Sequence, residues 1–151
     1  MLKGIPNIIS PELLKVLDEM GHTDEIVIAD GNFPGHSFGR PVIRLDGHGV
    51  PEILDAILQL MPLDTYPDKE GVMHAPCTLM ALEPGDVGKV QTPIWDEYKK
   101  IVAKYDERGA SAFEELNKWK FYDQTREKAC CIVMTSETAI YANVIIRKGV
   151  V

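Results

Sequence analysis

Two side chains that can move protons or bind hydroxyl groups stand near element ends in EMGHTDEIVIADGNFPGHS, residues 19–37. His22 follows Gly21, a residue type that commonly ends a helix, and Asp30 follows a run of strand-forming residues. An imidazole gives and takes a proton near neutral pH, and a carboxylate accepts two hydroxyl hydrogen bonds at once. The pair suits acid/base chemistry on a sugar-like molecule without metal or cofactor. We expect loops to bring both residues toward a shared cavity.

Each residue also has a simpler interpretation. A histidine after a helix can serve only to interact with the negative end of the helix dipole. An aspartate before glycine is a common turn former. The stretch Tyr141–Asn143 can be nothing more than the start of a strand. Spacing alone therefore predicts a soluble α/β domain with a candidate small-molecule site.

The elements that must position His22 and Asp30 are a helix and a strand. Ser10-Pro11-Glu12 is typical of a helix start, and leucines with helical spacing follow until Gly21. EIVIAD, residues 25–30, predicts a buried strand because three β-branched residues stand in it. A helix that leads so directly into a strand favours α/β layering. Residues 31–41 contain glycines and prolines and predict a long loop.

Further elements follow along the chain. PVIRL, residues 41–45, predicts a strand, and amphipathic helices are expected to begin at Pro51 and at Thr92-Pro93. Residues 111–128 predict one or two short helical pieces. Prolines interrupt residues 62–78 too often for an assignment.

The C-terminal region predicts two strands, CCIVMT and YANVIIRKG, joined by the polar turn SETA. We expect them to form a hairpin or a pair of neighbouring strands. The second is apolar enough to need cover, either from another subunit or from the rest of the chain.

Composition narrows the classes of partner. The 151 residues fit one domain and carry a formal charge of −7, with 23 acidic against 16 basic side chains. Because the basic residues form no run long enough for a stripe that follows phosphates, nucleic acid and anionic membranes are poor partners. No apolar stretch approaches the roughly 18 residues of a membrane span, and MLKGIPNIIS does not resemble a signal peptide. A cytoplasmic location is expected.

Cysteine spacing and the missing motifs exclude several sites. Cys77, Cys130 and Cys131 show neither disulfide nor zinc-ligand spacing and predict buried reduced thiols, so no metal site is expected. The P-loop, dinucleotide, nucleophile-elbow and zinc-protease motifs do not occur. A nucleotide-binding loop after Asp30 is disfavoured because its acid would repel phosphate.

Several segments recur together in a known family: ISPELLK, MGHTDEI, NFPGHS, VIRLDG, YANVI and KGV. With these segments in this order, the chain resembles the RbsD/FucU family of sugar mutarotases, and most closely its L-fucose mutarotase branch. The resemblance implies a single three-layer α/β/α domain over residues 1–151, with strands at the C-terminal end. It also implies a cytoplasmic enzyme that interconverts the anomers of a free sugar without a cofactor. It further implies assembly into a ring-like decamer with sites at subunit contacts.

The resemblance also implies roles for individual residues. His22 matches the proton-donating histidine and Asp30 the substrate-binding aspartate, while Tyr141, Ala142 and Asn143 match the sugar-binding stretch. A basic site residue, arginine in the fucose branch and histidine in the ribose branch, falls at Lys118 or Lys120. Lysine there is a departure, because it lacks the planar fork with which arginine grips two hydroxyls.

Mutarotation opens a cyclic hemiacetal and closes it on the other face, so protons must reach the ring oxygen and leave the anomeric hydroxyl. We expect His22 to protonate the ring oxygen and Asp30 and Asn143 to hold hydroxyls. Tyr141 either shuttles the second proton or positions a water that does. A ribose-type pyranase and a non-catalytic sugar-binding module are the alternatives.

Overall fold

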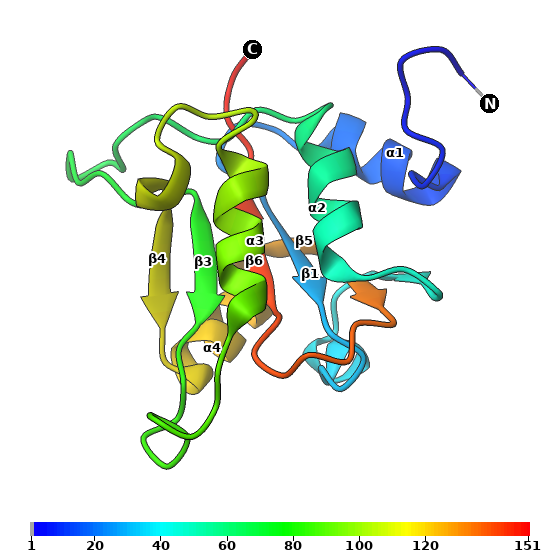
Figure 1. Cartoon of the computed structure of the whole chain (residues 1–151). Coiled ribbons are helices and arrows are strands. Elements are labelled where there is room, and N and C mark those ends of the chain that lie inside the picture. Colours follow the sequence, from blue (N-terminus) through cyan, green and yellow to red (C-terminus); the bar gives the residue numbers. More distant parts are fainter. Residues whose placement is uncertain (1) are drawn as a thin grey trace.

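Six strands form one mixed sheet in the computed structural model, which describes residues 2–151 (Figure 1). The sheet order is β2-β5-β1-β6-β3-β4. Strands β2, β5 and β1 run parallel, β3 is parallel to β4, and β6 lies antiparallel between β1 and β3. The strand bounds are β1 Glu25–Ala29, β2 Val42–Leu45, β3 Cys77–Met80, β4 Phe113–Leu116, β5 Ala129–Thr135 and β6 Val144–Arg147.

Helices cover both faces of the sheet. They are α1 Pro11–Glu19, α2 Val50–Leu58, α3 Pro93–Val102 and α4 Lys118–Lys128, with short 3-10 turns η1 Gly35–Phe38 and η2 Gly109–Ala112. Figure 1 views the face covered by α2 and α3, and α4 lies behind the sheet. The expected α/β architecture with three layers is confirmed.

Strand β1 shows how the two cores are separated. Its side chains alternate, so Ile26 and Ile28 join the core beneath α1, α2 and α3. Val27 and Ala29 face the other core, which contains Phe121 of α4 and the aromatic residues of the loop after β1. All five residues of β1 are buried, and each large aliphatic side chain contributes roughly 1.5–3 kcal/mol through burial.

Where local signals are strong, the predicted elements are confirmed. Ser10 caps α1, since its Oγ accepts a hydrogen bond from Leu13 N at 3.2 Å. Strands β1 and β2 and helices α2 and α3 lie where the sequence predicts them. Thr92 precedes α3 as expected, but its side chain makes no capping hydrogen bond.

The predicted pairing of the two C-terminal strands is wrong. Strand β1 lies between β5 and β6, parallel to the first and antiparallel to the second. Residues 136–143 cross the end of β1, a connection longer than the two to five or so residues of a hairpin loop. The apolar strand β6 is therefore covered by β1 and β3 of the same chain and needs no second subunit for its burial.

Strands β3 and β4 were not predicted from the sequence. Strand β3 lies at the end of the unassigned segment, and β4 occupies part of the segment expected to be helical. Strand β3 follows a segment interrupted by prolines, and β4, FEEL, contains no β-branched residue, so neither shows a strand pattern; their pairing defines them, β3 with β4 and β6. Helix α4 is one continuous helix rather than two pieces.

The cysteines are free, as predicted: Cys77 and Cys131 are buried and Cys130 is partly buried. Burial raises the pKa of the Cys131 thiol to about 11. No helix within residues 2–151 has the length and apolarity to cross a bilayer.

Candidate functional site

Asp30 is fixed at the carboxyl end of β1 by a reciprocal pair of hydrogen bonds. The Asp30 backbone N–H donates to Asn143 Oδ1, and Asn143 Nδ2 donates to Asp30 Oδ2, both at 2.9 Å. The backbone N–H of Asn32 donates to Asp30 Oδ1 at 2.9 Å. Burial raises the pKa of the Asp30 carboxyl, and the hydrogen bonds from Asn32 and Asn143 oppose that rise. The result is a buried carboxyl group in a fixed orientation.

Helix α3 holds the residues just before β6. Trp95 Nε1 donates to the Tyr141 carbonyl at 2.8 Å, and Tyr98 Oη donates to the Ala142 carbonyl at 2.7 Å. Tyr141 has φ 58°, a left-handed conformation that costs of order 1–3 kcal/mol for a residue other than glycine. The two hydrogen bonds from α3 offset this cost and hold Asn143 next to Asp30.

These residues surround a cleft of about 260 Å³, which we call the Asp30 cleft. Polar and apolar side chains line it: Asp30, Asn32, Phe33, Met80, Glu83, Lys118, Tyr122, Ile140, Tyr141 and Asn143. The mixture suits a monosaccharide, which carries hydroxyl groups and apolar C–H faces together.

Four of the five residues predicted to bind substrate meet at this cleft: Asp30, Lys118, Tyr141 and Asn143. Ala142 is fully buried, does not line the cleft, and contributes a backbone carbonyl bonded to α3. Of the two candidate lysines, Lys118 lines the cleft and Lys120 does not.

The Tyr141 phenol is engaged on both sides. Its Oη donates to Asp86 Oδ2 at 2.5 Å and accepts from the Glu83 backbone N–H at 3.2 Å. The hydrogen bond to Asp86 raises the pKa of the phenol, and burial adds to the rise. A phenol whose one proton is already donated is better suited to fixing the segment Glu83–Asp86 than to shuttling protons.

His22 lies at the opposite end of β1 from Asp30. At about 3.3 Å per residue, the backbone from Asp24 to Asp30 spans roughly 20 Å. The expectation that loops bring His22 and Asp30 to one cavity is therefore not met within a single chain. Asp24 and Asp30 directly flank the buried strand β1, so the loops that contain His22 and Asp30 start from opposite ends of this strand.

His22 has a carboxylate partner that the sequence did not reveal. Its Nε2 lies 3.0 Å from Oδ1 of Asp64, a buried residue, and the Tyr66 ring meets the imidazole edge to face at 5.0 Å. A carboxylate only accepts, so Nε2 carries the hydrogen, and in neutral imidazole Nδ1 can take a proton. Asp64 lies in the unassigned segment after α2, and no spacing rule connects it to His22.

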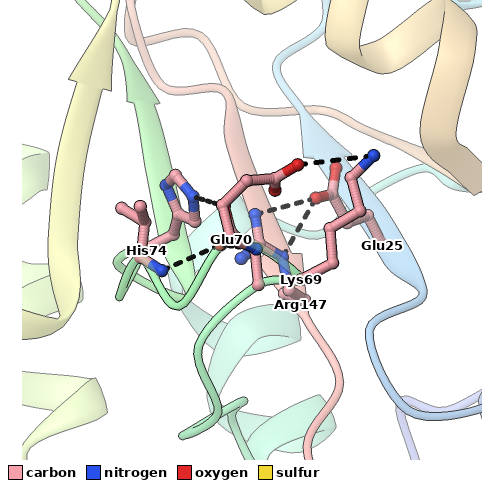
Figure 2. Close-up of polar contacts among 7 residues, drawn as sticks. Glu25, Lys69, Glu70, His74 and Arg147 are labelled. Carbon is pink, nitrogen blue, oxygen red and sulfur yellow. Dashed lines mark hydrogen bonds and ion pairs between the residues drawn. The ribbon is translucent and has the colours of Figure 1, made fainter.

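A second, larger cavity of about 850 Å³ lies beside Asp64 and Tyr66. Figure 2 shows its charged side chains: Arg147 pairs with Glu25 at 3.1 Å, and Lys69 pairs with Glu70 at 3.4 Å. His74, which Figure 2 also labels, contacts Asp68 at 2.7 Å. The named groups are paired within the chain, and the rest of the lining adds the acidic residues Asp24, Glu114 and Glu127, so this cavity is charged where the Asp30 cleft is mixed polar and apolar.

Comparison with known proteins gives consistent matches over the whole length. A fucose mutarotase from Homo sapiens is 44% identical over 153 residues, covering 99% of this chain and 94% of the relative. The crystal structure of FucU from Bifidobacterium longum is 54% identical, with a TM-score of 0.90 and 99% of both chains covered. A fucose mutarotase from Streptococcus pneumoniae, solved in complex with L-fucose, is 43% identical, with a TM-score of 0.88 and the same coverage.

The family model described as the RbsD / FucU transport protein family matches residues 3–151. The fold, the full-length relatives and this match agree. The chain belongs to the RbsD/FucU family.

Proposed function

We propose that this chain is an L-fucose mutarotase, an isomerase that interconverts the α and β anomers of the free sugar. The observation that carries the proposal is the reciprocal Asp30–Asn143 pair in a cleft of monosaccharide size. Relatives 41–44% identical over nearly the whole chain bear the name fucose mutarotase or L-fucose mutarotase, which favours fucose over ribose.

The cleft residues bind and orient the sugar. Asp30 accepts hydrogen bonds from hydroxyl groups, and Lys118 donates to a hydroxyl oxygen. Because the Asp30–Asn143 pair is fixed, the hydroxyl groups that it binds stay in place while the aldehyde group rotates about the C1–C2 bond. The reaction breaks and re-forms the bond between C1 and the ring oxygen with proton transfers and no change of oxidation state, so it requires no redox cofactor.

His22 of a second copy of the chain takes the proton of the anomeric hydroxyl on Nδ1, because Nε2 already donates to Asp64, and delivers a proton to the ring oxygen as the bond between C1 and that oxygen breaks. Within one chain, a strand separates His22 from Asp30 by far more than the width of a pyranose. A head-to-tail contact that places His22 and Asp64 of one copy over the Asp30 cleft of the next forms a closed ring when the rotation closes. The decamer that the family resemblance implies is such a ring.

Anomer exchange measured by saturation-difference NMR tests the activity. Purified protein is mixed with L-fucose, D-ribose or D-galactose, and exchange between the anomeric protons is followed. Fast exchange for L-fucose supports the proposal. Binding without exchange would show a sugar-binding module, and preference for D-ribose with pyranose–furanose exchange would show a ribose-type enzyme.

Complementation tests whether two copies share a site. His22→Ala and Asp30→Ala are each expected to lack exchange activity. Co-expressed with different tags and purified as mixed assemblies, they should regain about a quarter of parental activity by random pairing across head-to-tail contacts. A mixture as inactive as either variant would refute the shared site, and sedimentation gives the number of copies.

The cytoplasm is the proposed location. All three cysteines are free, which fits a reducing compartment, and a free monosaccharide is the substrate. Fractionation of cells that express a tagged chain tests this location.

A further inference from the structure

Lys118 lies against two aromatic rings at the edge of the Asp30 cleft. Its Nζ is 5.2 Å from the Trp119 ring centroid and 5.9 Å from that of Tyr122. The two rings meet edge to face with their centroids 6.0 Å apart. Both distances from Nζ lie within the range in which an aromatic face attracts a cation.

The position of Lys118 is otherwise unfavourable for a cation. It is the first residue of α4, where the helix dipole is positive, and the first turn of α4 contains no acidic residue. No ion pair of Lys118 is found within residues 2–151, although other lysines of the chain have carboxylate partners. Residues that violate a local rule in this way concentrate at functional sites.

Trp119 is not a core residue. Its side chain is 65% exposed, in contrast to Trp95, which is 8% exposed and bonded to Tyr141. The aromatic contacts of Trp119 are those with Lys118 and Tyr122. Trp119 does not line the cleft itself, but both residues that it contacts, Lys118 and Tyr122, do.

We propose that Trp119 is a positioning residue, whose ring holds the Lys118 ammonium at the Asp30 cleft so that it donates to a sugar hydroxyl. A lysine side chain is long and flexible, and its ammonium group is a point charge without a fixed fork of donors. The indole face restricts that freedom before the sugar binds, which lowers the entropy lost on binding. This inference rests on the proposed function, because it names the sugar as the ligand of Lys118.

A double-mutant cycle on sugar turnover tests the coupling. Trp119→Ala should raise the KM for L-fucose roughly two- to fivefold, with kcat nearly unchanged, because it weakens binding in ground and transition state alike. Trp119→Phe should retain most of the effect, since a phenyl ring also attracts a cation. Lys118→Gln should raise KM more, and adding Trp119→Ala to it should cause no further rise.

Lys120→Gln is the matched control, because Lys120 is an exposed lysine of the same helical turn that does not line the cleft. It should leave KM and kcat unchanged. If Trp119→Ala raises KM by the same factor with and without Lys118, the indole acts independently of lysine and the inference is overturned. No change of KM in Trp119→Ala alone overturns it as well.

A sugar-free measurement separates this inference from the proposed function. Ring currents of the two aromatic rings should move the ε-methylene protons of Lys118 upfield in the NMR spectrum, and Trp119→Ala should return them toward the usual lysine position. Ordinary shifts in the parent protein would refute the geometry whatever the activity. If the shifts are as expected but the parent shows no anomer exchange, the proposed function fails and the indole–ammonium contact stands.

Discussion

Removing the Asn143 side chain tests the physical basis of the cleft most directly. Asn143 and Asp30 are each 4% exposed, so water cannot replace a lost hydrogen bond without rearrangement. In Asn143→Ala the Asp30 backbone N–H loses its acceptor, and the carboxylate loses the donor Nδ2. With a neutral and a charge-assisted bond lost, the free energy of unfolding should fall by roughly 2–5 kcal/mol.

Urea and thermal unfolding at one fixed protein concentration measure this change, since an assembly makes the melting temperature depend on concentration. For a chain of this length, the expected loss corresponds to a fall in Tm of roughly 5–15 °C. Anomer exchange should fall together with stability, because Asp30 loses its fixed orientation.

Asn32→Ala is the matched control. Asn32 also bonds Asp30, but through its backbone N–H, which alanine retains. Its side chain is exposed, so the substitution should change the free energy of unfolding by less than about 0.5 kcal/mol. If Asn143→Ala proves no more destabilising than Asn32→Ala, the reciprocal pair does not hold the cleft together.

The remaining predictions concern the proton-transfer groups. His22→Ala should slow anomer exchange by about 10² to 10⁴-fold, with an unchanged circular dichroism spectrum. Asp64→Asn should slow exchange less, because the imidazole remains. Parental exchange rates in both variants would exclude His22 and Asp64 from catalysis. Tyr141→Phe should keep exchange within about tenfold of the parent, because the phenol proton is donated to Asp86, and a larger loss of kcat measured by exchange NMR would restore a shuttle role. Because the folded-state pKa of Asp30 is raised above 3.8, the folded state binds more protons, so this group's contribution to stability is lost as pH rises from about 4 through the folded pKa. Urea midpoints measured across that range should fall less steeply in Asp30→Ala, and identical slopes would contradict the assignment.

The sequence predicts those parts of the fold that short-range patterns encode. Ser10 and Pro11 predict the start of α1, and the β-branched run predicts β1, because capping and strand burial depend on a few neighbouring residues. Strands β3 and β4 are defined by partners far away in the sequence, so no local pattern marks them.

The same distinction holds for the candidate site. Asp30 was predicted from its place at the end of a strand, and Tyr141 and Asn143 through family resemblance, and the structure gathers all three at one cleft. The meeting of His22 with Asp30 was expected because each stands at an element end where a loop could bring it toward a shared cavity, but opposite ends of β1 lie at opposite ends of the sheet. Asp64 was missed, since its contact with His22 joins residues 42 positions apart and depends on the path of the chain after α2.

The placement of β6 also bears on how the protein is made. Strand β6 alone joins the β2-β5-β1 part of the sheet to the β3-β4 part, and it carries Asn143 to Asp30 across 113 positions of sequence. During synthesis the ribosome releases residues 144–147 long after β1 has emerged, so a nascent chain cannot capture sugar until that late strand inserts. Strands β1 and β2 both pair with β5 at residues 129–135, so until β5 and β6 emerge the buried apolar strand β1 has none of its partners and is exposed to wrong pairing.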